Sequence, residues 1–409
     1  MSAGQTGYGD LAGWLGLGLL VNLTGTLTTH GGISACPEAV EAASAMMRRG
    51  VDILDLQAHA SRIIAEATGA EAGFVAACSS AGICMAVAGA MTGDDLARIE
   101  QLPDSSAMCN EVVVQAGHVV NYGHSIAQDI RVAGARPVVV GEVNSARSHQ
   151  LQAAIGPATA AGLYVVSHHC AQEGQLPFAA FRQICHDRGI PVIVDLAAEY
   201  DLHGYLHEGA DITIHSSQKF LRGPTAGIVA GRKALVRAAF LQSYGIARPM
   251  KVGKESIAGA LAALVAWTRR DHEAERRRDR EKLDWWRSRL EGCPGITATI
   301  DPDPTGNPFE RLEIAVDADR AGLSAVQLVC ELETGDPPIA VRTHDIEQGC
   351  FVMDPRSLGE HELEVVADRL RAILDAARAG HRASVAADVQ QWKLRKVQAL
   401  KAWPDRPTA

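Results

Sequence analysis

Between residues 35 and 245 the sequence alternates short β-branched runs with longer, alanine-rich amphipathic stretches. The runs are Glu111–Val114, Pro137–Gly141, Leu163–Ser167, Pro191–Asp195, Ile212–His215 and Gly227–Ala230. The stretches between them include Pro37–Arg49, Gln57–Thr68, Phe178–Arg188 and Lys233–Ser243. Nearly continuous apolar strands that alternate with helices predict a parallel or mostly parallel sheet covered on both faces. This pattern restricts the chain to an α/β architecture.

The chain continues beyond this pattern into other kinds of structure. Ser256–Leu290 predicts one long helix or two abutting ones, and after Pro294 shorter strands and helices indicate a smaller α+β domain. We therefore expect an N-terminal arm (1–34), a large domain (35–255), a connecting helix (256–290), a small C-terminal domain (291–380) and a tail (381–409) that is helical to Trp403.

Composition excludes several classes of protein. The formal net charge of the 409 residues is −9, so the chain as a whole has no basic field that would attract nucleic acid or anionic lipid. Nine cysteines at irregular spacing, none in a CxxC pair, argue against a disulfide framework and a structural zinc site and favour the reducing cytoplasm. Leu11–Leu23 is too short to span a bilayer and has Asp10 in front, so we interpret it as a helix or arm.

A lysine and an aspartate occur where chemistry is expected in such a sheet. Asp195 ends an apolar strand, and ligands of α/β sheets bind beyond the carboxyl ends of the strands. Lys219 follows the strand Ile212–His215 in a Ser-Ser-Gln-Lys turn and precedes a Gly-Pro loop. A lysine there can form an imine once desolvation and neighbouring charge lower its pKa. The spacing of 24 positions from Asp195 to Lys219 leaves room for one helix and one strand, so both should reach the same edge.

Two further segments suit an anion. The small-residue turn Ala76–Ile83 leads into an apolar helix, and its Ser80, Ala81 and Gly82 would present backbone N–H groups at the helix start. The loop Gly245–Glu255 carries Arg248, Lys251 and Lys254, which could contact a phosphate or be an ordinary basic loop.

Taken in order, these segments resemble the fold-type I enzymes that use pyridoxal 5′-phosphate (PLP). More narrowly, the chain is similar to the D-glucosaminate-6-phosphate ammonia-lyase and selenocysteine synthase family over roughly residues 20 to 270. The motifs that carry the resemblance are Asn22-Leu-Thr-Gly25, Cys78-Ser-Ser-Ala-Gly82, Gln115-Ala-Gly-His118, Asn121-Tyr-Gly123, Tyr164–Cys170, Asp195–Glu199 and Arg248–Glu255.

The resemblance implies a role for each candidate residue. Lys219 would carry PLP as a Schiff base and act as the catalytic base, and Asp195 would pair with the pyridine nitrogen. His118 would stack on the ring. The residues expected near the phosphate are Ser80, Ala81, Gly82, Ser216 and Gly223.

Three more residues are candidates for contact with the substrate: Arg248, His168 and Arg342. Arg342 lies where fold-type I enzymes often place an arginine for the substrate carboxylate, although a surface strand-end arginine would fit the sequence as well. Ser167-His-His-Cys170 could suggest a metal cluster, but adjacent histidines at a strand end point apart, so we expect no metal.

The expected function is that of a PLP-dependent lyase that converts a 3-hydroxy amino acid into a 2-oxo acid and ammonia, with sugar-derived amino acids such as D-glucosaminate 6-phosphate among the candidate substrates. An amino acid racemase or epimerase, and an RNA-interacting protein like selenocysteine synthase, are the alternatives. For the arginine-rich stretch 269–287, interleaved acidic residues favour a solvated helix face over an RNA-binding stripe. We expect a small-molecule substrate, no nucleic acid or membrane partner, and a homo-oligomer of at least two chains.

Overall fold

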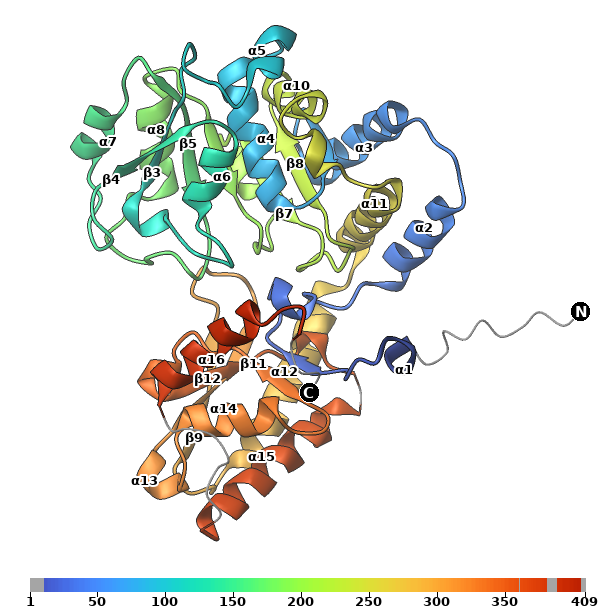
Figure 1. Cartoon of the computed structure of the whole chain (residues 1–409), viewed down its shortest axis with the longest axis vertical. Helices are drawn as coiled ribbons and strands as arrows, with labels where there is room; N and C mark the ends of the chain where they lie inside the picture. Colours follow the sequence, from blue (N-terminus) through green and yellow to red (C-terminus); the bar gives the residue numbers. More distant parts are fainter. Residues whose placement is uncertain (1–10, 360, 381–387, 406–409) are drawn as a thin grey trace, which may run out of the picture. The chain divides into compact units, whose positions relative to one another are not determined.

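The computed structural model describes residues 11–359, 361–380 and 388–405 and separates into two compact units (Figure 1). The large unit comprises Ile33–Arg270 with Pro304–Asn307, and the small unit comprises the chain up to Gly32, Asp271–Asp303 and the chain from Pro308 onward. The domain boundaries expected from the sequence remain a proposal. No helix among the described residues is long and apolar enough to cross a membrane.

A seven-stranded sheet forms the centre of the large unit, in the order β2-β8-β7-β6-β5-β3-β4. β8 is antiparallel to both its neighbours, whereas the pairs from β7 to β4 are parallel. The strands are β2 (Ala72–Ala76), β3 (Glu111–Gln115), β4 (Arg136–Val140), β5 (Thr159–Val165), β6 (Val192–Asp195), β7 (Ile212–Ser216) and β8 (Gly227–Gly231). The mostly parallel sheet expected from the sequence is therefore confirmed.

Helices cover both faces of this sheet, as consecutive valines of β3 show. Val112 and Val114 belong to the core cluster beneath α4, α6 and α10, whereas Val113 belongs to the cluster beneath α7 and α8. The helices of the large unit are α2 (Pro37–Met47), α3 (Ile53–Thr68), α4 (Ser79–Thr92), α5 (Leu96–Gln101), α6 (Ile126–Val132), α7 (Ser148–Ala154), α8 (Phe178–His186), α9 (Gly204–His207), α10 (Lys233–Leu241) and α11 (Lys254–Arg269). In Figure 1, α4 crosses the front of the sheet.

Two glycines allow α4 to pack closely. A Cβ on Gly82 would lie 3.0 Å from Val229 and 3.1 Å from Ile214, so this glycine faces β8 and β7. A Cβ on Gly89 would lie 2.5 Å from the backbone nitrogen of Ala239 in α10. The helix that begins at the small-residue turn is thus seated directly on the sheet.

The small unit contains two sheets. β12 (Cys350–Met353), β10 (Glu310–Val316) and β9 (Ile296–Pro302) form an antiparallel sheet, and β1 (Val21–Leu23) pairs in parallel with β11 (Ile339–Val341). Its helices are α1 (Leu11–Leu15), α12 (His272–Leu290), α13 (Ala318–Ala321), α14 (Ala325–Glu333), α15 (Glu362–Arg378) and α16 (Val389–Lys401). The segment expected to be an arm therefore also supplies a strand to the small unit.

Among the shorter helices that the sequence predicts after Pro294, one expected over Ala321–Glu333 begins only at Ala325 in the structure. Gly322 adopts a φ of 80°, which ends α13, and Ser324 then caps α14 in a reciprocal arrangement with Gln327. Part of the expected tail, residues 381–387 and 406–409, lies outside the described residues.

Candidate active site

Asp195 and Lys219 meet at the carboxyl edge of the sheet. Asp195 ends β6, is 6% exposed, and accepts a hydrogen bond of 3.0 Å from the backbone N–H of Ala197. Burial raises the pKa of Asp195 to about 6, while the charge of Lys219 acts in the opposite direction. The half-buried Lys219 lies in the turn after β7, the strand next to β6. The structure thus brings the two predicted catalytic residues into electrostatic contact.

The turn that carries Lys219 is held in a defined conformation. The N–H of Ser217 donates to the carbonyl of Ala226 at 2.9 Å, and the N–H of Gly223 donates to the carbonyl of Ser217 at 2.8 Å. A Cβ on Gly223 would overlap the Ser217 hydroxyl, so only glycine fits there. Arg222, with a φ of 62°, adopts a left-handed conformation that side-chain-bearing residues rarely take. Lys219 therefore projects from a rigid support.

The start of α4 lies beside the end of β7. The hydroxyls of Ser79 and Ser216 are hydrogen-bonded, and a Cβ on Gly227 would overlap the carbonyl of Cys78. The N–H of Gly82 donates to the carbonyl of Cys78 at 3.0 Å and the N–H of Ala81 to the Cys78 thiol at 3.4 Å, so Gly82 serves packing, and the N–H groups of Ser79 and Ser80 are the ones placed to meet an anion. Ser80 and Ala81 line the adjacent pocket, whereas Gly82 does not.

His118 provides a buried aromatic ring after β3. It is 3% exposed, and its Nδ1 accepts a hydrogen bond of 3.2 Å from the N–H of Val165. Its ring meets Tyr164 edge-on, with centroids 4.5 Å apart. Burial lowers the pKa of His118 to about 4, so the imidazole is neutral at pH 7 and its proton lies on Nε2. A neutral, fixed ring suits the stacking role expected of it.

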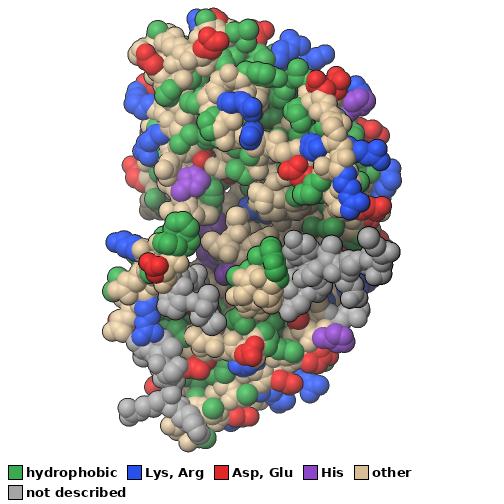
Figure 2. Space-filling model, turned by 45° about the vertical axis from the view of Figure 1, so that its right-hand side comes forward, with side chains coloured by type: hydrophobic (Ala, Val, Ile, Leu, Met, Phe, Trp, Pro, Cys, Tyr) green, Lys and Arg blue, Asp and Glu red, His purple; other side chains and the backbone are tan. Residues whose placement is uncertain are grey.

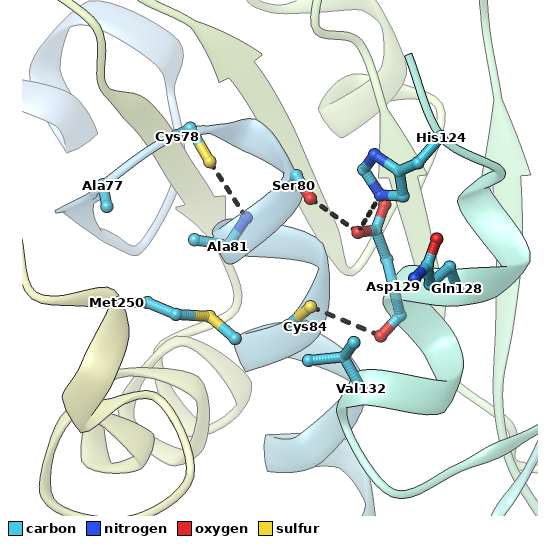
Figure 3. Close-up of a pocket in the computed structure, with 10 residues that line it drawn as sticks. All are labelled: Ala77, Cys78, Ser80, Ala81, Cys84, His124, Gln128, Asp129, Val132 and Met250. Carbon is cyan, nitrogen blue, oxygen red and sulfur yellow. Dashed lines mark hydrogen bonds and ion pairs between the residues drawn. The ribbon is translucent and has the colours of Figure 1, made fainter. Parts of the chain in front are cut away.

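A pocket of about 520 Å³ opens at the start of α4 (Figure 3). Its lining residues are Ala77, Cys78, Ser80, Ala81, Cys84, His124, Gln128, Asp129, Val132 and Met250. Asp129, on α6, accepts hydrogen bonds from Ser80 at 2.5 Å, from His124 at 2.7 Å and from the Tyr122 hydroxyl. The sequence reasoning missed this cluster. The sequence does contain a pattern that points to Asp129. This residue lies three positions after Ile126 and one before Ile130, so helical spacing places its carboxylate on the apolar, buried face of α6.

The three residues predicted to contact the substrate, Arg248, His168 and Arg342, do not line this pocket. Arg248 is exposed, and its loop reaches the pocket through Met250 instead. His168 is half-buried, with its ring 3.9 Å from that of His169. Arg342 lies in the small unit, where it is 4% exposed and donates to the carbonyl of Thr24 at 3.2 Å. Burial, followed by the charge of Arg311, lowers the pKa of Arg342 to about 10.

The large unit offers the groups that PLP requires. Asp195 is a buried carboxylate suited to a protonated pyridine nitrogen, and the start of α4, with the N–H groups of Ser79 and Ser80, suits a phosphate. Beside Lys219, the Ser217 hydroxyl and the Gln218 side-chain carbonyl are buried, and neither has a hydrogen-bond partner within the part of the chain that the structure describes. Since buried polar groups are normally paired, these two orphaned atoms fit a site completed by a polar ligand.

Comparisons with known proteins agree with this geometry. The family model of L-seryl-tRNA selenium transferase matches residues 20–279. The chain is 38% identical over 363 residues to D-glucosaminate-6-phosphate ammonia lyase of Salmonella typhimurium (strain 14028s), which covers 89% of this chain and 97% of that protein. It is 36% identical over 362 residues to a Streptomyces 5′-C-glycyluridine monooxygenase-decarboxylase, which covers 88% and 91% respectively.

A solved structure of D-glucosaminate-6-phosphate ammonia-lyase superposes with a TM-score of 0.82 at 37% identity and covers 90% of this chain and 99% of that one. The fold-type I class expected from the sequence is thereby confirmed.

Proposed function

Since the chain belongs to the L-seryl-tRNA selenium transferase family, we propose that it is a PLP-dependent lyase acting on a 3-hydroxy amino acid. The substrate class is that of D-glucosaminate 6-phosphate, after which the relative at 38% identity is named. The observation that carries the proposal is that the buried Asp195 and the half-buried Lys219 follow the adjacent parallel strands β6 and β7, where the charge of Lys219 lowers the pKa of Asp195 against the effect of burial. The products would be a 2-oxo acid and ammonia.

Each residue of this edge has a separate task. Bound PLP supplies an electron sink for the charge that develops at the substrate Cα. Asp195 would keep the proton on the pyridine nitrogen, and His118 would pack against the ring. Lys219 would hold the cofactor covalently, and its amine, free once the substrate is bound, would take up the Cα proton. The Cβ hydroxyl would leave as water with that proton, and the released enamine would tautomerise and hydrolyse to the 2-oxo acid and ammonia.

The cofactor assignment is tested first. The purified protein should absorb in the visible, and borohydride should fix PLP to Lys219 alone. Lys219→Ala should abolish the reducible adduct while a matched control, Lys233→Ala at the start of α10, retains it. Fixation to another lysine would show that the assignment is wrong.

The reaction is tested on a panel of D- and L-3-hydroxy amino acids, with and without a phosphate. A lyase should release 2-oxo acid and ammonia in equal amounts, at the same rate with and without oxygen. The anaerobic arm matters because one relative is named a monooxygenase-decarboxylase. Oxygen uptake with loss of CO₂, or inversion of the amino acid without release of ammonia, would contradict the lyase proposal.

The arginine-rich helix α12 favours a small-molecule substrate over RNA. Several of its cations pair with carboxylates: Arg277 pairs with Glu273 at 2.8 Å, and Arg280 bridges Asp284 and Glu310. Figure 2 shows blue and red side chains interspersed over the visible face. Filter binding of a tRNA at low salt should therefore be negligible.

We also propose that the protein forms at least a dimer in the cytoplasm. Large apolar side chains are exposed on α2 and at the start of α3, including Val40 (57%), Met47 (63%) and Leu54 (51%). Such a patch marks a protein contact, and a second copy is the usual partner of a soluble enzyme. The cysteines are free thiols, which suits a reducing compartment. Met47→Glu should lower the mass found by light scattering, and an unchanged oligomer would exclude this patch.

A further inference from the structure

A short loop between β9 and β10 contacts the segment that follows Asp195. The loop is Pro304–Asn307, and it belongs to the large unit although both of its flanking strands belong to the small unit. Prolines at 304 and 308 restrict its backbone, and Gly306 adopts a φ of 81°. No step of the proposed reaction uses this loop.

The side chain of Asn307 makes the hydrogen bonds of a strand partner. Its Oδ1 accepts the backbone N–H of Tyr200 at 2.8 Å, and its Nδ2 donates to the carbonyl of Ala198 at 3.4 Å. Nδ2 also donates to the Thr305 hydroxyl at 2.8 Å, and this hydroxyl donates to Oε1 of Glu199 at 3.2 Å. The half-buried amide is therefore fixed in one orientation and holds two backbone groups 107 and 109 positions earlier in the chain.

The contacts of Asn307 begin where the pairing with β7 ends. The N–H of Ser216 in β7 donates to the carbonyl of Ala197 at 3.3 Å, and the next carbonyl, that of Ala198, is the one that Asn307 binds. The carboxylate of Asp195 accepts a hydrogen bond of 3.0 Å from the N–H of Ala197. Asn307 therefore fixes the chain one residue beyond the group that orients this carboxylate.

The same asparagine supports the segment that carries Lys219. The ring of Tyr200, whose N–H it binds, lies 5.6 Å from that of Phe220 and 4.3 Å from that of Trp267, measured between centroids. Phe220 is 5% exposed and directly follows Lys219 in the chain. One side-chain amide thus contacts the support of both residues that are proposed to hold the cofactor.

We propose that Asn307 is a positioning residue that keeps the carboxylate of Asp195 aligned with the pyridine nitrogen of the cofactor. It acts through the backbone of Ala198 and Ala197. This inference rests on the proposed function, because it takes Asp195 as the partner of the PLP ring. A charge-assisted hydrogen bond is directional, so a carboxylate whose support can shift loses this bond first.

The test compares PLP with deaza-PLP, the analogue in which a C–H group replaces the pyridine nitrogen. Cofactor-free protein is titrated with each compound, and absorbance gives the dissociation constants. Asn307→Ala should weaken PLP binding about tenfold, the size expected for loss of one charge-assisted hydrogen bond, and weaken binding of the analogue by no more than about twofold. Equal losses for the two compounds would show a general structural role and overturn the proposal.

A second variant separates the two halves of the amide. Asn307→Asp keeps an acceptor for the N–H of Tyr200 but replaces the donor to the carbonyl of Ala198 with an oxygen. It should show the same selective loss of PLP affinity, because Ala198 is the link to Asp195. An unchanged PLP affinity in this variant would overturn the proposal, even if Asn307→Ala does not fold.

A double-mutant cycle shows whether Asn307 acts through Asp195. Asp195→Asn removes the carboxylate, so adding Asn307→Ala to it should weaken PLP binding by no more than about a further twofold. A further tenfold loss would show that Asn307 contributes independently of Asp195, which would also overturn the proposal.

Asn110→Ala is the matched control. Asn110 is half-buried, and its Nδ2 donates to the Ser105 carbonyl at 3.3 Å and to the Ser105 hydroxyl at 3.0 Å, but it precedes β3 and so lies at the opposite edge of the sheet. It should leave both affinities unchanged, and a loss of PLP affinity equal to that of Asn307→Ala would overturn the proposal. Failure of the parent protein to bind PLP would instead refute the proposed function, so the two failures are distinguishable.

Discussion

Replacing Asp195 with asparagine should make the cofactor-free protein more stable at neutral pH, although it removes a group that the proposed reaction needs. Burial raises the pKa of Asp195 from 3.8 to about 6. Each pKa unit corresponds to about 1.4 kcal/mol, so keeping the carboxylate ionised in the folded, empty protein costs about 3 kcal/mol.

The pH dependence follows from the direction of this shift. Because the folded pKa lies above the unfolded one, the protonated carboxyl contributes stability that is fully present below about pH 4 and is lost as pH rises through about 6. Asp195→Asn, which mimics the neutral form, should match the parent near pH 4. At pH 7.5 it should exceed the parent by up to about 3 kcal/mol.

Urea unfolding of the cofactor-free proteins at pH 4 and pH 7.5 measures this difference. Asp211→Asn is the control, because Asp211 is equally buried at 3% but accepts hydrogen bonds from His186 and from the N–H of Val192, both at 2.8 Å, and from Arg232 at 2.9 Å. It should destabilise the protein at pH 7.5. The reasoning is refuted if Asp195→Asn lowers the free energy of unfolding at pH 7.5 as much as Asp211→Asn does. With PLP bound, Asp195→Asn should lose its advantage and most of its turnover.

Three further changes probe the surroundings of the site. Gly227→Ala would drive a methyl group into the carbonyl of Cys78 and displace the start of α4, so PLP affinity measured by absorbance should fall about tenfold; unchanged affinity would contradict the close packing. In Gly89→Ala the added Cβ would lie 2.5 Å from the backbone nitrogen of Ala239, so the free energy of unfolding in urea should fall by about 1–3 kcal/mol. An unchanged free energy of unfolding would show that α10 can shift away from α4 at little cost. Arg248→Ala should lower the mass measured by light scattering, because the Arg248 side chain is exposed and it is Met250 that lines the pocket. Loss of PLP from an oligomer of unchanged mass would show instead that Arg248 binds the cofactor.

The sequence predicted the strands of the parallel sheet because each is a continuous apolar run. It missed β2 (Ala72–Ala76), since alanine and glycine supply little strand preference and the strand forms through pairing with β8. The start of α4, Asp195 and Lys219 could be anticipated because they follow strands in a parallel sheet.

The Asp129 cluster could not be assembled in the same way. The side-chain partners of Asp129 come from the start of α4 and from the segment before α6, and the hydrogen bond between Ser80 and Asp129 spans 49 positions. No local pattern specifies such a convergence. The role expected of Gly82 was likewise read from a turn motif, whereas the structure shows it packing against the sheet.

The pairing of β1 with β11 has a consequence for biosynthesis. Thr24, one residue after β1, accepts a hydrogen bond from Arg342, 318 positions later. At about 5–20 residues per second, the ribosome needs roughly 15 to 60 s to supply this partner. During that interval the large unit has already emerged, while Val21–Leu23 must wait without its neighbouring strand. In that interval Val21–Leu23 is an unpaired strand segment that is open to misassembly and chaperone capture.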